Sequence, residues 1–148
     1  MTCYRIASLG LMGIVVVAAY AQWTPPFGVP AFHAHAPTQA ESLPKLFSYT
    51  KLTGEDRAHS YQVEAFKKAA LIPGVLYQLP CYCYCDRREG HASVHSCFET
   101  SHAAGCKECM KEALYAYAMT MKHATPAQIR AGLKRGEFRN VELIDKTP

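Results

Sequence analysis

The chain has 148 residues, of which 49% are hydrophobic and 19% are charged, and its formal net charge is +4. This length suits a single domain with a modest hydrophobic core. The charge is weak, acidic and basic residues are interspersed, and Lys and Arg form no extended run, so the sequence gives no electrostatic support for nucleic-acid binding.

Residues 1–21 have the features of a secretory signal peptide. Arg5 precedes an apolar run over residues 6–21, and this run is a little shorter than the roughly 20 residues that span a bilayer. The pattern favours a cleaved signal peptide over an uncleaved membrane anchor. We therefore expect an exported protein, periplasmic or extracellular, that contacts a membrane only if this segment is retained. Cleavage would remove Cys3 and leave six cysteines in an oxidising compartment.

Residues 22–47 contain five prolines and show little periodicity, which predicts an extended linker ahead of a domain over residues 48–148. His33 and His35 lie in this linker. An exposed histidine pair in a flexible segment is more often incidental than functional, so they are left out of the candidate site. We expect truncation of residues 1 to about 47 to leave the stability of the domain unchanged.

Two helices are predicted on either side of the cysteine-rich region. The first begins near Ser60 and should stop before the breaker pair Pro73-Gly74. The second should run from about Ser101 to Lys122, with Thr100 or Ser101 as its N-cap. An apolar stripe at 3.6-residue spacing should face the core; it comprises Ala113, Leu114, Tyr117 and Met121.

A last short helix is predicted from Pro126 to about Arg135. Thr125 suits its N-cap, Gln128 would complete a capping box, and Gly136 would end it. The tail from residue 137 is expected to fray, and residues 86–96 should form a loop or a short helical turn. The predicted fold is a mainly α, small single domain of about three to four helices around an irregular Cys/His-rich centre.

Six of the seven cysteines fall within residues 81–109, together with three histidines. Thiolate and imidazole are the side chains that soft and borderline metal ions prefer. The candidate metal ligands are Cys81, Cys83, Cys85, His91, His95, Cys97, His102, Cys106 and Cys109.

The spacing of these residues favours convergence on a metal ion. If residues 81–85 are extended, the three thiols point to one face, where cysteines two residues apart would make strained disulfides. If the stretch is a turn, the donors still crowd together. On a continuous helix, His102, Cys106 and Cys109 would share one face. We therefore expect the cysteine triplet and the Cys106/Cys109 pair to lie close together.

Two other interpretations remain open. Three disulfides could staple an extracytoplasmic interaction domain, and six cysteines admit 15 pairings. A thiol redox protein could use Cys106-x2-Cys109, although the usual βαβ context is missing. No nucleophile–base–orienter set indicates hydrolysis, so binding is favoured over enzymatic activity.

The cysteine-rich region resembles an exported bacterial family named for its PCYCGC motif, whose function is poorly defined. The resemblance covers about residues 60–135. It rests on the stretch 72–85, which ends in PCYCYC, on Gly90-His91, on HSCF at 95–98, on Cys106-x2-Cys109 and on residues 127–130. Tyr84 stands where the motif has glycine, and no lipobox cysteine follows the apolar run. The resemblance implies fold and export more than chemistry.

Taken together, the patterns predict an exported soft-metal binding module that serves storage, delivery or detoxification. Thiolate and imidazole donors favour Cu(I) or Zn(II) over hard cations, which prefer oxygen ligands. The expected partners are the metal ion and a protein that donates or accepts it.

Overall fold

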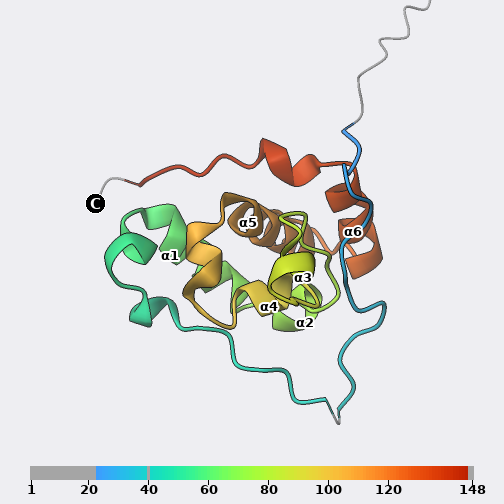
Figure 1. The fold of residues 1–148 in the computed structure, drawn as a ribbon, viewed down its shortest axis with the longest axis horizontal. Coiled ribbons are helices and arrows are strands. Elements are labelled where there is room, and N and C mark those ends of the chain that lie inside the picture. The colour runs from blue at the N-terminus through green and yellow to red at the C-terminus, as the bar shows by residue number, and fades with distance from the viewer. Residues whose placement is uncertain (1–22, 40, 147–148) are drawn as a thin grey trace, which may run out of the picture.

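The computed structural model describes residues 23–39 and 41–146, so the predicted signal peptide lies outside the described residues. Within these ranges the chain forms six α-helices, four 3-10 helices and no strand. None of the described helices is long and apolar enough to cross a membrane. The mainly α fold is confirmed (Figure 1). The predicted Cys/His-rich centre is also confirmed, because cysteine and histidine side chains gather in two groups.

Helix α1 (Ser60–Ala69) begins with a capping box between His59 and Gln62 and buries Phe66 against the core. It ends before Pro73, as predicted. The proline then occupies the first position of the short helix α2 (Pro73–Leu76), where the missing N–H costs no hydrogen bond. The breaker pair therefore ends one helix and starts the next.

Helix α5 (Lys107–Met121) lies at the centre of the fold and packs against α1, α4 and α6 (Figure 1). The prediction of one continuous helix from Ser101 is wrong. A 3-10 helix, η3 (Ser101–Gly105), is capped by Thr100, and the chain is extended at Cys106, with φ −119° and ψ 105°. Gly105 weakens helical continuity at this point, and the Cys106 sulfur accepts a hydrogen bond from the Cys109 N–H as the new N-cap.

The core-facing side of α5 differs from the predicted stripe. Ala113 is fully buried, but Met121 is 53% exposed, and Leu114 and Tyr117 are only partly buried. The buried residues of the helix are Cys109, Met110, Glu112, Ala113, Tyr115 and Ala116. The predicted stripe contains apolar residues alone, whereas the buried face also includes Cys109 and Glu112 and lies toward the thiols.

Two short helices connect the cysteine triplet to η3. They are α3 (Cys85–Arg88) and α4 (Val94–Cys97), which confirms short helical turns in this region. The Val94 N–H donates to the Leu79 carbonyl at 2.9 Å. This bond fixes α4 beside the start of the cysteine triplet.

Helix α6 (Pro126–Lys134) has the predicted capping box between Thr125 and Gln128. The prediction of a frayed tail is wrong. A 3-10 helix, η4 (Glu137–Asn140), follows and leaves Phe138 only 2% exposed. Burial of this aromatic ring against the core holds the tail in place.

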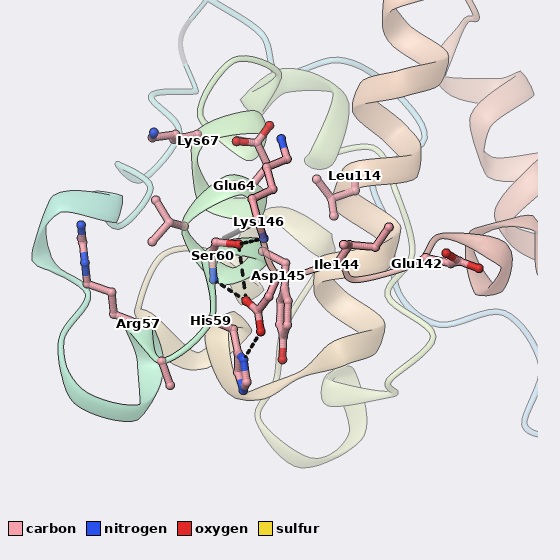
Figure 2. Close-up of a pocket in the computed structure, with 13 residues that line it drawn as sticks. Arg57, His59, Ser60, Glu64, Lys67, Leu114, Glu142, Ile144, Asp145 and Lys146 are labelled. Atoms are coloured by element: carbon pink, nitrogen blue, oxygen red, sulfur yellow. Dashed lines mark hydrogen bonds and ion pairs between the residues drawn. The ribbon is translucent and has the colours of Figure 1, made fainter. Parts of the chain in front are cut away.

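The tail then crosses to the start of α1. Asp145 accepts a hydrogen bond from the Ser60 N–H at 2.8 Å and contacts His59 Nδ1 at 2.7 Å (Figure 2). The Lys146 N–H donates to the Ser60 hydroxyl. The C-terminal segment therefore caps the first helix of the domain.

Residues 23–39 and 41–47 follow the outside of the domain in a largely irregular conformation (Figure 1). Trp23 packs edge-on against Tyr82 and Phe138, with ring centroids 5.5 and 6.0 Å away. The Phe47 N–H donates to the Phe98 carbonyl at 2.7 Å. These contacts argue against the expectation that truncation of residues 1 to about 47 leaves the stability of the domain unchanged.

Candidate metal centre

The candidate ligands come from the 81–85 segment, the loop after α3, α4, η3 and the start of α5. Seven of the nine predicted residues fall into two groups of metal-ligating atoms. Within each group, the ligand atoms lie within 4.8 Å of one another. We call Cys81, Cys83, Cys97 and Cys109 the four-thiol group, and Cys85, His91 and His102 the outer group.

The four-thiol group has the dimensions of a tetrahedral site. The Cys81 sulfur lies 3.2 Å from that of Cys83 and 3.4 Å from that of Cys109. The sulfurs of Cys83 and Cys109 are 3.5 Å apart. An ion with four bonds of about 2.3 Å to sulfur would hold these atoms about 3.8 Å apart. A small expansion of the group would therefore accommodate such an ion, and the expected proximity of the triplet to Cys109 is confirmed.

The backbone of the cysteine triplet is a turn, not an extended strand. The Tyr84 N–H donates to the Cys81 carbonyl at 3.1 Å, and α3 begins at Cys85. The turn draws the sulfurs of Cys83 and Cys85 to 2.7 Å. Crowded donors are what the sequence predicts for a turn at this position.

Tyr84 adopts the left-handed conformation, with φ 58° and ψ 33°. Glycine reaches this conformation without the steric cost that a β-carbon imposes, which is roughly 1–2 kcal/mol. The tyrosine ring packs edge-on against Phe27, and its hydroxyl donates to the Gly28 carbonyl. Tyr84 thus fits a backbone suited to the glycine of the PCYCGC motif, with side-chain contacts that offset part of the strain.

The outer group places one thiol beside two imidazoles. The Cys85 sulfur lies 3.2 Å from His102 Nε2, and the rings of His91 and His102 have centroids 5.0 Å apart. This group also touches the four-thiol group, because His91 Nδ1 lies 3.3 Å from the Cys97 sulfur.

The remaining two predicted ligands have different positions. Cys106 caps α5 and lies beside Cys83 at the edge of the four-thiol group. His95 belongs to neither group. It is 1% exposed, its Nδ1 pairs with Glu99 at 2.9 Å, and its Nε2 is buried without a hydrogen-bond partner among the described residues.

Two of the candidate ligands have a lowered pKa, whereas the pKa values of the thiols of Cys81, Cys85, Cys106 and Cys109 are raised. Hydrogen bonding from Cys106, and then from Cys109, lowers the pKa of Cys83 to about 7, so this residue is partly thiolate near neutral pH. Burial, and then the nearby charge of His102, lowers the pKa of His91. A lowered pKa keeps the His91 imidazole neutral, which is the form that binds metals.

Glu112 is a buried polar residue at the site that sequence reasoning missed. Its side chain is fully buried, and its carboxylate accepts a hydrogen bond from the Tyr82 N–H at 2.6 Å. Burial raises the pKa of Glu112 to about 8. The spacing Cys106-x2-Cys109-x2-Glu112 contained the signal, since residues three apart share a helix face. Because glutamate is rarely buried, the sequence alone does not single out Glu112 as part of the site.

Two of the cavities on the described domain bear on function. One, of about 540 Å³, is lined by Cys85, His102 and Cys106 and opens onto the outer group. Another, of about 1030 Å³, lies between α1 and the C-terminal segment (Figure 2). Although Ser60, His59 and Asp145 line this second cavity, the Ser60 hydroxyl contacts Asp145 and not His59. This arrangement lacks the nucleophile–base pair of a hydrolase.

No protein-family model, curated protein or solved structure matches this chain. The membership in the PCYCGC family remains a prediction from the motif, and the geometry of the site carries the functional argument.

Proposed function

We propose that this protein is an exported module that binds Cu(I) or Zn(II) for storage, delivery or detoxification. One observation carries the proposal: four thiols from three separate segments converge until their sulfurs lie within 4.8 Å of one another. The segments are the turn at Cys81 and Cys83, α4 with Cys97, and α5 with Cys109. Thiols gathered around a single point are the donor set of a soft ion.

The arrangement of the sulfurs supports coordination over a disulfide framework. The sulfur of Cys83 has three sulfur neighbours within 3.5 Å, from Cys81, Cys85 and Cys109. A disulfide joins two sulfurs at about 2.05 Å and excludes a third partner. A shared cluster, with histidines at its edge, is typical of metal coordination.

Both candidate ions suit features of the site. Four thiolates around a point match the tetrahedral preference of Zn(II), whereas a donor set this rich in sulfur favours Cu(I). In either case, binding deprotonates the thiols and ties α4 and α5 to the cysteine triplet, so the binding free energy stabilises the fold. Export is proposed from the signal-peptide pattern and from the PCYCGC resemblance.

The test is to load the reduced, unprocessed chain anaerobically with Cu(I) or with Zn(II) and to measure metal content and X-ray absorption at the metal edge. We expect mainly sulfur ligands at about 2.3 Å. The double variant Cys97→Ser/Cys109→Ser should bind less metal and should lose the extra thermal stability that metal gives the wild type. Cys3→Ser, in the predicted signal peptide, is the matched control and should behave like the wild type. A spectrum with only oxygen and nitrogen ligands, or unchanged metal content in the double variant, contradicts the proposal.

A further inference from the structure

The two groups of ligands differ in composition and in exposure. In the four-thiol group, Cys97 and Cys109 are fully buried and Cys81 is 4% exposed, whereas Cys83 is partly buried. In the outer group, Cys85 is buried, but His91 and His102 are partly exposed. Three of the four thiols in the first group are therefore buried, whereas two of the three ligands in the outer group reach the surface of the domain.

We propose that the outer group is a second, open metal site through which a soft ion enters and leaves the four-thiol group. This inference rests on the proposed function, because it assigns a route to the same ion. Three protein donors leave a tetrahedral ion with one free position, which is the feature that separates open metal sites from closed structural ones.

The free position has access to an incoming ligand. The cavity of about 540 Å³ is lined by Cys85 and His102 of the outer group and by Cys106. A donor that carries the ion on a thiolate could place its sulfur in this cavity and become the fourth ligand. The four-thiol group already supplies four donors of its own, so it needs no ligand from outside.

The two groups are joined by contacts between potential ligands. The sulfurs of Cys85 and Cys83 are 2.7 Å apart, and His91 Nδ1 lies 3.3 Å from the Cys97 sulfur. An ion can therefore pass inward by ligand exchange, with one metal–ligand bond formed for each one broken. Its oxidation state does not change, and each thiol that binds it releases one proton to solvent.

The experiment compares the full reduced chain with His91→Asn/His102→Asn under anaerobic conditions, with Cu(I) as the probe and bicinchoninate as a coloured competitor. We expect the wild type to bind about two ions, one that the competitor removes quickly and one that it removes slowly. The double variant should lose about one equivalent, the fast one, and should load the slow site more slowly. His35→Asn, which changes an exposed histidine far from both groups in sequence, is the matched control.

The outcomes separate this inference from the proposed function. If the double variant keeps both equivalents of Cu(I) and the wild-type loading rate, the outer group is not an entry site, whereas the proposed metal-binding function is unaffected. Loss of both equivalents from the folded double variant shows a single cluster and also overturns the inference. If the wild type binds neither Cu(I) nor Zn(II), the proposed function fails as well. Far-UV circular dichroism checks folding, and the single variant His102→Asn, at a partly exposed position, replaces the double variant if that one unfolds.

Discussion

Glu112 places a carboxyl group in the interior of the domain, one helical turn after Cys109. One oxygen accepts the hydrogen bond from the Tyr82 N–H, and the other is buried without a partner among the described residues. A buried carboxylate is costly when it is charged, and the raised pKa of about 8 means that Glu112 holds its proton at neutral pH. A neutral acid adds no negative charge beside thiolates that must gather around a metal ion.

This protonation gives a prediction for Glu112→Gln in the reduced, metal-free protein. Between its ordinary pKa of 4.5 and about 8, the folded state keeps a proton that the unfolded state loses, so the stability of the wild type falls as pH rises through this window. Glutamine keeps the acceptor for Tyr82 and does not ionise. At about pH 7 the variant should be more stable by on the order of 1–3 kcal/mol, measured by urea unfolding at several pH values.

Glu142→Gln is the matched control, because Glu142 is exposed and lies in the C-terminal segment, away from helix α5 in sequence. Its unfolding should keep the pH dependence of the wild type. Equal pH dependence in the wild type and in Glu112→Gln would show that Glu112 is charged in the folded protein.

At the level of elements, the C-terminal segment has a structural role in starting α1. Asp145 accepts the Ser60 N–H at the first turn, where backbone donors lack partners within the helix. The hydrogen bond with His59, followed by that from Ser60, lowers the pKa of Asp145 below 3.8. A lowered pKa means that the stabilising contribution is present above pH 3.8 and is lost as pH falls below it.

We therefore expect Asp145→Ala to lower the thermal unfolding midpoint by roughly a few degrees at neutral pH. The difference from the wild type should shrink as the pH falls below about 4. The control is Glu142→Ala, an exposed acid in the same segment. Equal midpoints for Asp145→Ala and the wild type at neutral pH would show that the tail does not stabilise α1.

The elements that the sequence predicted well are those set by local chemistry. The capping box of Thr125 and Gln128, the proline at the start of α6 and the glycine after it act within a few residues. The break at Cys106 is not evident from the apolar periodicity of residues 101–122, and Gly105 is the only local signal for it. One glycine is tolerated inside many helices, so Gly105 alone does not predict that the Cys106 sulfur will cap a new helix.

The sequence predicts most of the residues that could bind a metal ion, but not their separation into two groups. Spacing brought together the cysteine triplet and Cys109, and the structure confirms that contact. The separation into a four-thiol group and an outer group depends on the turn at Tyr84 and on the break before α5. His95 lies in the same Cys/His-rich region as His91, four residues further on. Its Nδ1 nevertheless pairs with Glu99, and it joins neither group.

On the scale of the whole molecule, the helices form a frame around a centre made of irregular segments. Central helix α5 supplies Cys109 and Glu112, and the surrounding short elements supply the other donors. The buried cysteines of this centre belong to the same core as Leu79, Val94 and Met110. Metal binding would tie these segments together and would contribute part of the stability of the domain.

The most direct test of metal coordination is a count of reactive thiols in protein purified anaerobically, without reductant, from its native compartment. Metal content, thiol count and intact mass are measured before and after treatment with a strong chelator. We predict bound Cu(I) or Zn(II), few reactive thiols at first, and the six thiols of residues 81–109 after the metal is removed. If no thiols appear after chelation, and the mass is lower by six hydrogens, the cysteines are paired in disulfides and the central claim is wrong.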